Sequence, residues 1–164
     1  MTQEQTLTIQ QTIDLAVQHH KAGDLPKAES IYQQILLADP DQPDALHFLG
    51  LIAQQVGKND IAFDLISKAL AIMPDYAEAH YNLGLVLNAL EKTSDSLESF
   101  HKAIAIKPDY VRAHYNLGNA QQSLGKFDEA VISYNNAITI KPDYAEAHSK
   151  LGNTLQRLGR LDEA

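Results

Sequence analysis

The sequence predicts an all-α solenoid, a stack of antiparallel helix hairpins, from three observations. The stretch 77–110 reappears 34 residues later at 111–144 and begins again at residue 145, and a fixed period of this length is typical of solenoids. Within each copy, apolar residues recur at steps of three and four in two runs, which places them on one face of each of two helices. Helices of roughly 12–15 residues are marginal alone in water, so the hairpins must stack to bury these faces.

The copy at 111–144 shows how one hairpin is bounded. Its first apolar run consists of Ala113, Leu117, Ala120 and Leu124. Its second consists of Ala130, Val131, Tyr134, Ala137, Ile138 and Ile140. Gly125 lies between the runs and suits the left-handed backbone conformation that ends many helices, whereas Pro142 cannot continue a helix. The pattern therefore predicts two helices joined at Gly125, the second of which ends before Pro142.

The same register extends over nearly the whole chain. After a polar leader, 1–8, we expect one continuous array with repeats 9–42, 43–76, 77–110, 111–144 and a partial repeat 145–164. Small residues hold the eighth position (Ala16, Gly50, Gly84, Gly118, Gly152) and the twentieth (Ala28, Ala62, Ser96, Ala130, Ala164). A bulky residue holds the twenty-fourth position of each whole repeat: Tyr32, Ile66, Phe100 and Tyr134. The two helices of each hairpin are therefore expected to approach closely at the small residues.

These positions carry a resemblance to a known family. Leucine and a small residue at positions seven and eight, alanine at twenty and twenty-seven, an aromatic residue near twenty-four and proline at thirty-two resemble the tetratricopeptide repeat. The resemblance covers 9–164 without gaps, and the phrases AHYNLGNA and KPDYAEAHSKLGNTLQRLGRLDEA are similar to the arrays of O-GlcNAc-transferase-like enzymes and related bacterial repeat proteins. The resemblance implies a right-handed superhelical solenoid whose concave groove binds a protein or peptide partner.

Two repeats depart from the pattern. Repeat 9–42 carries Ile35 where later copies have alanine, and we interpret it as an N-terminal cap. Pro26 in this repeat fits the first turn of a helix. Glu91 stands where the other copies have glycine, and a residue with a Cβ in the left-handed conformation costs about 1–2 kcal/mol. The turn 91–96 is therefore expected to adopt another geometry or to be looser.

Composition and charge limit the classes of function. The chain has no cysteine, which excludes disulfides and thiolate metal sites. It shows no signal peptide, and no run approaches the ~18 apolar residues that cross a membrane. The net charge of -8 argues against sequence-independent binding to the phosphates of a nucleic acid. It favours solubility, with attraction of basic partners as the alternative. We expect a cytoplasmic protein that binds neither nucleic acid nor membranes.

Catalytic and metal chemistry find no support in the residue pattern. His80, His114 and His148 share one repeat position, but packed helices lie ~8–10 Å apart, whereas zinc holds nitrogen ligands at about 2.0–2.1 Å. Packing between repeats is the better interpretation of this row. No Gly-rich phosphate loop and no grouping of nucleophile, base and orienting acid can be assembled. We therefore expect no metal, no cofactor and no enzymatic activity.

The family resemblance implies that the first helix of each repeat lines the groove. The candidate groove residues are His47, Glu78, Tyr81, Asn82, Leu85, Asn88, Arg112, Tyr115, Asn116, Asn119, Gln122, Asn153 and Gln156. Charges at groove positions cancel, with acidic residues in the N-terminal part and basic residues, including Lys150 and Arg157, in the C-terminal part. This arrangement would orient a bound peptide. Members of the family that bind the tail of a chaperone hold its terminal carboxylate with a lysine at position five and an asparagine or arginine at position nine. The first three repeats do not supply this pair.

Asn82 and Asn116 share the sixth repeat position. A primary amide both donates and accepts, so it can hold a peptide backbone without reading its sequence. Helices ~8–10 Å apart match about every third residue of an extended chain, and the pair resembles the asparagine ladder of the O-GlcNAc-transferase array. Other residues replace asparagine in the remaining repeats. The alternative is that the two amides only bond neighbouring repeats.

Three functional hypotheses follow. The leading one is a non-enzymatic scaffold that binds an extended or helical peptide in the groove. The alternative is a substrate-recruiting arm of a larger enzyme, such as a glycosyltransferase, because repeat five stops at Ala164 inside its second helix. A third is homo-oligomerisation through that end. Its leucines lack a partner helix, and burying each of them against another copy is worth roughly 1.5–3 kcal/mol. Those leucines are Leu151, Leu155, Leu158 and Leu161.

Overall fold

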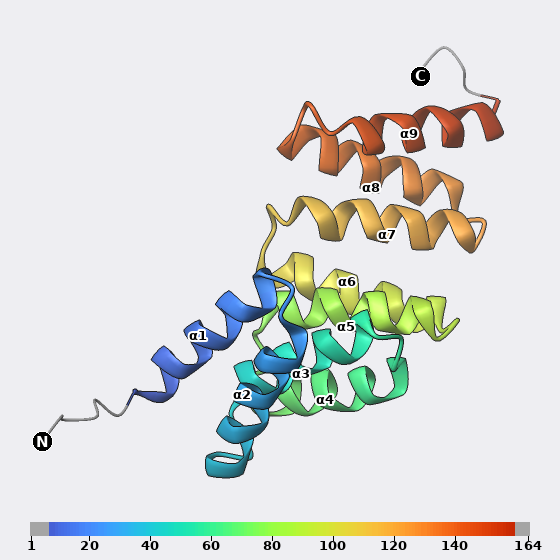
Figure 1. The fold of residues 1–164 in the computed structure, drawn as a ribbon. Coiled ribbons are helices and arrows are strands. Elements are labelled where there is room, and N and C mark those ends of the chain that lie inside the picture. The colour runs from blue at the N-terminus through green and yellow to red at the C-terminus, as the bar shows by residue number, and fades with distance from the viewer. Residues whose placement is uncertain (1–6, 160–164) are drawn as a thin grey trace, which may run out of the picture. The chain divides into compact units, whose positions relative to one another are not determined.

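The computed structural model describes residues 7–159, and this part of the chain is entirely helical and looped, which confirms the all-α class (Figure 1). The helices are α1 (Ile9–Lys21), α2 (Leu25–Ala38), α3 (Pro43–Gln55), α4 (Asn59–Ile72), α5 (Ala77–Ala89), α6 (Thr93–Ile106), α7 (Val111–Ser123), α8 (Phe127–Ile140) and α9 (Ala145–Arg157). None of these helices is long and apolar enough to cross a bilayer.

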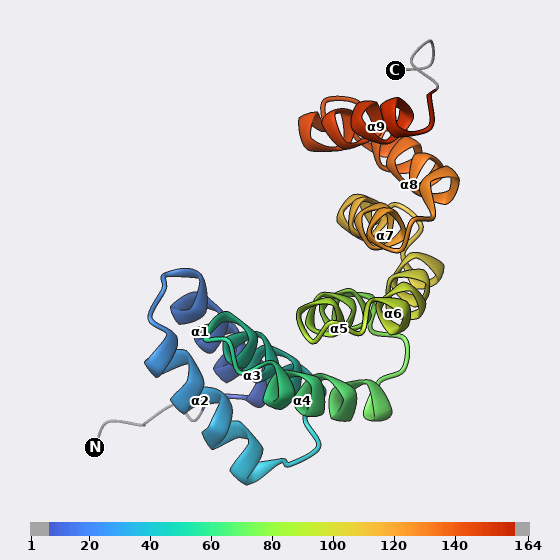
Figure 2. The same ribbon diagram turned by 90° about the vertical axis from the view of Figure 1, so that its right-hand side faces the viewer.

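The described residues form two compact units, and within each unit consecutive helices pack against each other as the hairpins of a solenoid. The first unit runs to Pro74 and contains α1 to α4, and the second begins at Asp75 and contains α5 to α9. In the second unit, the first helices of the hairpins, α5, α7 and α9, follow one side, and α6 and α8 follow the other (Figure 2). The side formed by α5, α7 and α9 is where the sequence predicts a groove.

The turns inside the hairpins share one backbone conformation. Gly23, Gly57, Gly125 and Gly159 have φ between 70° and 82°, in the left-handed region. Glu91 has φ 60°, so the expectation of a different geometry at this turn is wrong. The cause is the surrounding hydrogen bonds, because Lys92 N still donates to Leu87 O at 2.8 Å, as Lys126 N does to Gln121 O at 2.9 Å. The Glu91 backbone therefore carries strain of about 1–2 kcal/mol.

The small residues of the repeat lie where the two helices of a hairpin meet, as predicted. Ala28, Ala62, Ser96 and Ala130 are fully buried. A Cβ added to Gly84 would lie 2.6 Å from Phe100, and one added to Gly118 would lie 2.6 Å from Tyr134. Real Cβ atoms do not approach a ring so closely, so glycine is needed at these two positions for the rings to reach the helix backbone.

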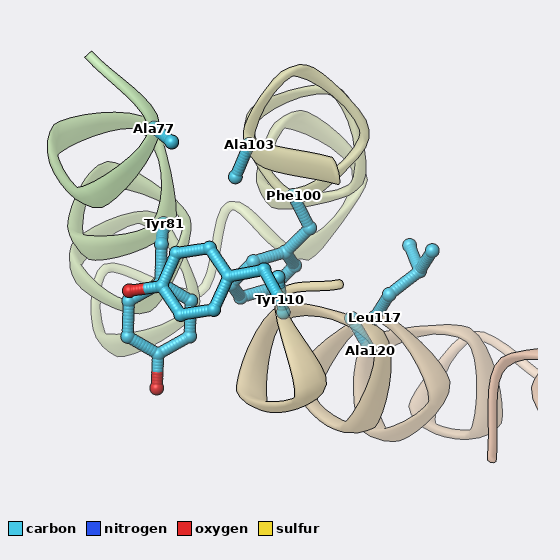
Figure 3. Packing of buried hydrophobic residues seen from close by; sticks show 8 residues of the cluster. Ala77, Tyr81, Phe100, Ala103, Tyr110, Leu117 and Ala120 are labelled. Atoms are coloured by element: carbon cyan, nitrogen blue, oxygen red, sulfur yellow. The ribbon is translucent and has the colours of Figure 1, made fainter. Parts of the chain in front are cut away.

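The core of the second unit passes from one hairpin to the next. Phe100 of α6 is fully buried and lies in one cluster with Tyr81 of α5 and with Tyr110, which precedes α7 (Figure 3). Leu117 and Ala120 of α7 belong to the same cluster. The α5/α6 hairpin therefore buries its apolar face partly on α7, the first helix of the following hairpin, which is the stacking that the repeat requires.

Candidate functional site

Two of the predicted groove residues are core residues. His47 of α3 is 2% exposed, and its ring centroid lies 5.2 Å from that of Phe48. Tyr81 of α5 is 5% exposed, with ring centroids 4.9 Å from Tyr110 and 6.0 Å from Phe100 (Figure 3). Burial raises the pKa of Tyr81, and the charge of a nearby arginine partly opposes this shift. Both side chains are therefore explained by packing in the core, whereas their repeat position predicted that they line the groove.

The Asn116 amide bonds neighbouring repeats, which is the alternative that the sequence left open. Its Nδ2 donates to the Tyr81 hydroxyl at 3.1 Å and to the Arg112 carbonyl at 3.0 Å. The Arg112 guanidinium lies 5.1 Å from the centroid of the Tyr81 ring. Asn82, the other member of the pair, is partly buried on α5. Asn116 and Arg112 therefore join α7 to α5 and hold Tyr81 in place.

The remaining candidates on α5 have contacts of their own. The Ser96 hydroxyl donates to Asn88 Oδ1 at 2.7 Å, which ties α5 to α6. Glu78 Oε1 lies 3.4 Å from Lys107 Nζ in a solvent-exposed pair, and such pairs contribute little to stability. Leu85 is partly buried and packs on the cluster around Phe100.

A polar groove lies between α7 and α9 in the second unit. It is an open cavity of about 730 Å³. Its lining residues are Asn119, Gln122, Ser123, Lys150, Asn153, Gln156 and Arg157. An adjoining cavity of about 490 Å³ shares Lys150 and Asn153 and adds Tyr115, Ala145, Glu146 and Ser149. We call the two together the α7/α9 groove. It brings together Tyr115 and four of the five predicted amide residues of α7 and α9; the fifth, Asn116, does not line it.

A buried tyrosine orients the amides on the α7 side of this groove. Tyr134 of α8 is fully buried, and its hydroxyl donates to Asn119 Oδ1 at 2.9 Å, with Gln122 Oε1 at 3.2 Å. Burial, followed by the nearby Tyr115, raises the pKa of Tyr134, so the hydroxyl keeps its proton near neutral pH. Both amide oxygens lie beside this hydroxyl, which has one proton to donate, and both side chains line the groove, where their NH2 groups can donate to a ligand.

The α9 side of the groove carries its positive charge. Lys150 and Arg157 line the larger cavity, and no acidic residue does. The Arg157 guanidinium lies 5.8 Å from the centroid of the Phe127 ring, at the start of α8. Glu146 lines only the smaller cavity, nearer the start of α9. The groove therefore offers amide donors and two cations at one end and a carboxylate at the other.

The histidine row has a structural role in the turns between repeats. Nε2 of His114 lies 2.9 Å from the Pro108 carbonyl, and Nε2 of His148 lies 2.8 Å from the Pro142 carbonyl. Each ring thus bonds the carbonyl of the proline that closes the preceding repeat. Within residues 7–159, no group of three or more His, Asp or Glu side chains is placed to hold a metal ion.

The leucines predicted to lie bare on α9 are not all exposed. Leu155 is 1% exposed, so it is already buried without the second helix of its repeat. It lies on the same face as Ala147, two turns earlier, which is also fully buried, and α9 packs on α8. Leu151 and Leu158 are partly buried. Leu161 lies outside the described residues.

Two family models of this type of repeat match parts of the chain. A family model described as TPR repeat matches residues 86–125 and 123–159. A second, described as Tetratricopeptide repeat, matches residues 10–34. The chain belongs to the tetratricopeptide repeat family, and its fold is that of a non-catalytic scaffold for protein interaction.

Solved structures of similar fold include several named MamA. A crystal structure of MamA has 28% sequence identity and a TM-score of 0.83, covering 90% of this chain and 86% of that one. A structure of MamA AMB-1 has 27% identity and a TM-score of 0.79, covering 93% and 84%. MamA 41-end from Desulfovibrio magneticus RS-1, at 19% identity, a TM-score of 0.83 and coverage of 94% and 88%, shares the fold. No curated protein sequence matches the chain.

Proposed function

We propose that the α7/α9 groove holds an extended segment of a partner protein. The observation that carries this proposal is the orientation of the amides: the hydroxyl of the buried Tyr134 donates to Asn119 Oδ1 at 2.9 Å and lies 3.2 Å from Gln122 Oε1. Their N–H groups are then available to the carbonyl oxygens of a bound backbone. Asn153 and Gln156 supply further amides from the opposite helix.

The spacing of the groove fits an extended chain. Asn119 and Gln122 on α7, and Asn153 and Gln156 on α9, are each three residues apart and line the groove from its two sides. A segment that lies along the groove between the two helices therefore has amides on both sides of its backbone. Hydrogen bonds to the backbone give affinity without strict sequence dependence. Tyr115 adds a partly buried ring in the adjoining cavity, against which an apolar side chain of the segment would pack.

The test is a peptide titration with amide-deletion variants. Peptides selected from a random library on the intact chain are titrated by fluorescence anisotropy against the wild type and against an Asn153→Ala, Gln156→Ala double variant. Both side chains are solvent-exposed, so the fold is retained. We expect at least about a tenfold loss of affinity, because each backbone hydrogen bond contributes about 0.5–1.5 kcal/mol.

Asn135→Ala is the matched control for this titration, because Asn135 is an exposed amide on α8, away from the groove residues. It should leave affinity unchanged. Equal binding by the wild type and the double variant would remove the α7/α9 groove from the account. A substrate-recruiting arm of a larger enzyme would use the same groove, and the coding sequence downstream of Ala164 decides between the two roles.

Self-association through α9 is a second candidate. A Cβ added to Gly152 meets no atom of residues 7–159 within 4 Å, whereas one added to Gly118 collides with a ring. The face around Gly152, with the partly buried Leu151 and Leu158 beside it, therefore has room for another helix. Light scattering across a concentration series tests this candidate. A mass that rises with concentration, and that Leu151→Glu keeps at the monomer value, would support it; a monomer at every concentration would end it.

A further inference from the structure

We propose that the α7/α9 groove selects a segment with two carboxylates three residues apart, one bound by Lys150 and the other by Arg157. This inference rests on the proposed function and deepens it by naming the chemistry of the partner. The partner is an acidic stretch of a protein, in a conformation close to polyproline II.

Charge is the first step of the argument. The whole chain has a formal net charge of -8, yet the larger cavity is lined by two cations, four amides and a serine, with no carboxylate. Neither Lys150 nor Arg157 lies within ion-pair distance of an acidic side chain among residues 7–159. A positive site on an acidic protein favours an anionic partner, and charge complementarity of this kind sets specificity and association rate.

The second step is the spacing of the two cations. Lys150 and Arg157 are seven residues apart on α9, and two turns of helix bring them to nearly the same face, about 10.5 Å apart along the axis. A polyproline II chain has three residues per turn and rises ~3.1 Å per residue. Its side chains three residues apart therefore share one face at a spacing of roughly 9 Å, which matches the two cations.

The third step is what holds the backbone between the two carboxylates. Asn153 lies one helical turn after Lys150 on the same side of α9, and both line the groove. A polyproline II backbone makes no internal hydrogen bonds, so its carbonyl groups can accept from the amides of both helices. The Phe127 ring beneath Arg157 restricts the guanidinium, whose planar fork suits a carboxylate.

Glu146 gives the segment a direction. It lies one turn before Lys150 and lines only the smaller cavity, so a third carboxylate on that side would be repelled and a basic residue attracted. The two acidic residues of the bound segment therefore lie towards Arg157 at the end of α9, and a neutral or basic residue of the segment lies near Glu146.

The test uses four labelled peptides with a proline- and alanine-rich backbone, titrated against the intact chain by fluorescence anisotropy. The first has two glutamates three residues apart, the second has them two apart, the third has glutamine in place of both, and the fourth repeats the first with an amidated C-terminus. We expect the first and fourth to bind alike, and about tenfold weaker binding for each carboxylate lost or misplaced. Binding that depends on a free C-terminus would assign the site to a terminal carboxylate and overturn the proposal.

Charge variants of the chain complete the test. Lys150→Gln and Arg157→Gln should each weaken the first peptide about tenfold and leave the glutamine peptide unchanged. Lys102→Gln, an exposed cation on α6 paired with Glu98, is the control and should have no effect. Circular dichroism of every variant checks that the fold is kept.

The outcomes separate this proposal from the broader one. If both the glutamate and glutamine peptides bind and lose affinity only in the Asn153→Ala, Gln156→Ala variant, the groove is a peptide site without selection for acids. If none of the four binds while library-selected peptides do, the acidic assignment fails alone; if no peptide of either kind binds, the proposed function fails with it. Tighter binding of a single-stranded oligonucleotide, lost in Arg157→Gln, would overturn the peptide assignment.

Discussion

Tyr32 in the first unit and Tyr134 in the second hold the same repeat position and are both fully buried, yet their hydroxyl groups differ. The Tyr134 hydroxyl donates to Asn119 Oδ1 at 2.9 Å, with Gln122 Oε1 at 3.2 Å. The Tyr32 hydroxyl has no hydrogen-bond partner among the described residues. Its ring stacks on Phe48, with centroids 5.6 Å apart. The residue at this repeat position thus bonds the groove amides in the second unit, whereas in the first unit it only packs against apolar side chains.

The difference comes from the ninth and twelfth positions of the same repeats. Where the fourth repeat has two amides, the first has Val17 and His20. His20 instead contacts Gln55 Oε1 through Nε2 at 3.1 Å. A buried hydroxyl without a partner costs about 1–3 kcal/mol, and burial raises the pKa of Tyr32 as it does that of Tyr134. The amides that face the groove in the second unit therefore also stabilise its core.

The largest expected effect comes from the glycine beneath Tyr134. Gly118→Ala places a methyl group 2.6 Å from a ring that is fully buried and cannot move aside. We expect a loss of about 1–3 kcal/mol in the free energy of unfolding, measured by urea denaturation. Gly152→Ala, with no atom within 4 Å of the new Cβ, should gain up to about 1 kcal/mol from helix propensity. Changes of the same sign in both variants would contradict this packing.

Removing the two hydroxyl groups tests the comparison itself. Tyr134→Phe removes the donor to Asn119, and we expect a loss of about 0.5–1.5 kcal/mol. Tyr32→Phe removes a buried group without a hydrogen bond, so we expect no loss or a gain of up to about 1 kcal/mol. Thermal and urea unfolding measure both. A larger loss for Tyr32→Phe than for Tyr134→Phe would reverse the roles assigned to the two residues.

The same pair predicts how stability depends on pH. Both pKa values are raised above the ordinary value of 10.0 by burial. When the pKa of a group is higher in the folded state than in the unfolded state, the group contributes its full stabilisation at pH values below the unfolded pKa. This contribution to the free energy of unfolding is lost as the pH rises through the folded pKa. Unfolding free energy should therefore fall with pH above about 10, and each Phe variant should flatten this dependence. An unchanged slope in the variants would show that other groups cause it.

The smallest effect is expected at the turn between α5 and α6. Glu91 has φ 60°, whereas the corresponding turn of the next hairpin has Gly125 at φ 74°. Glu91→Gly relieves the left-handed strain but adds disorder to the unfolded chain, so a net gain of about 0.5–1 kcal/mol is expected. Gly125→Ala is the matched reverse and should cost about 1 kcal/mol. A destabilised Glu91→Gly would mean that the glutamate side chain stabilises the turn.

The helices and their turns could be predicted because a 34-residue period repeats the same physical pattern several times. The conformation at Glu91 could not be predicted from its residue type, because the hydrogen bond from Lys92 N to Leu87 O is the same as in the glycine turns. The burial of Tyr81 could not be predicted from its repeat position. It depends on Tyr110, the last residue of the same repeat, whose ring packs against that of Tyr81. Repeat position alone does not show that contact.

The groove was predicted in part. The amides of α7 and α9 were identified by position, and Lys150 and Arg157 by charge, but their connection to Tyr134 was not. A signal was present in the sequence: tyrosine at position twenty-four occurs together with amides at positions nine and twelve only in the fourth repeat. Positions twelve and twenty-four lie on different helices of the hairpin, so they come into contact only when the two helices pack together.

The most direct test of the groove is a measurement of its side-chain amide groups by nuclear magnetic resonance. The NH2 resonances of Asn119, Gln122, Asn153 and Gln156 are followed while the peptide with two glutamates three residues apart is added. The account predicts that these four groups shift together and saturate, and that the Asn135 amide on α8 does not shift. Shifts confined to α6 and α8, with the four groove amides unchanged, would contradict it.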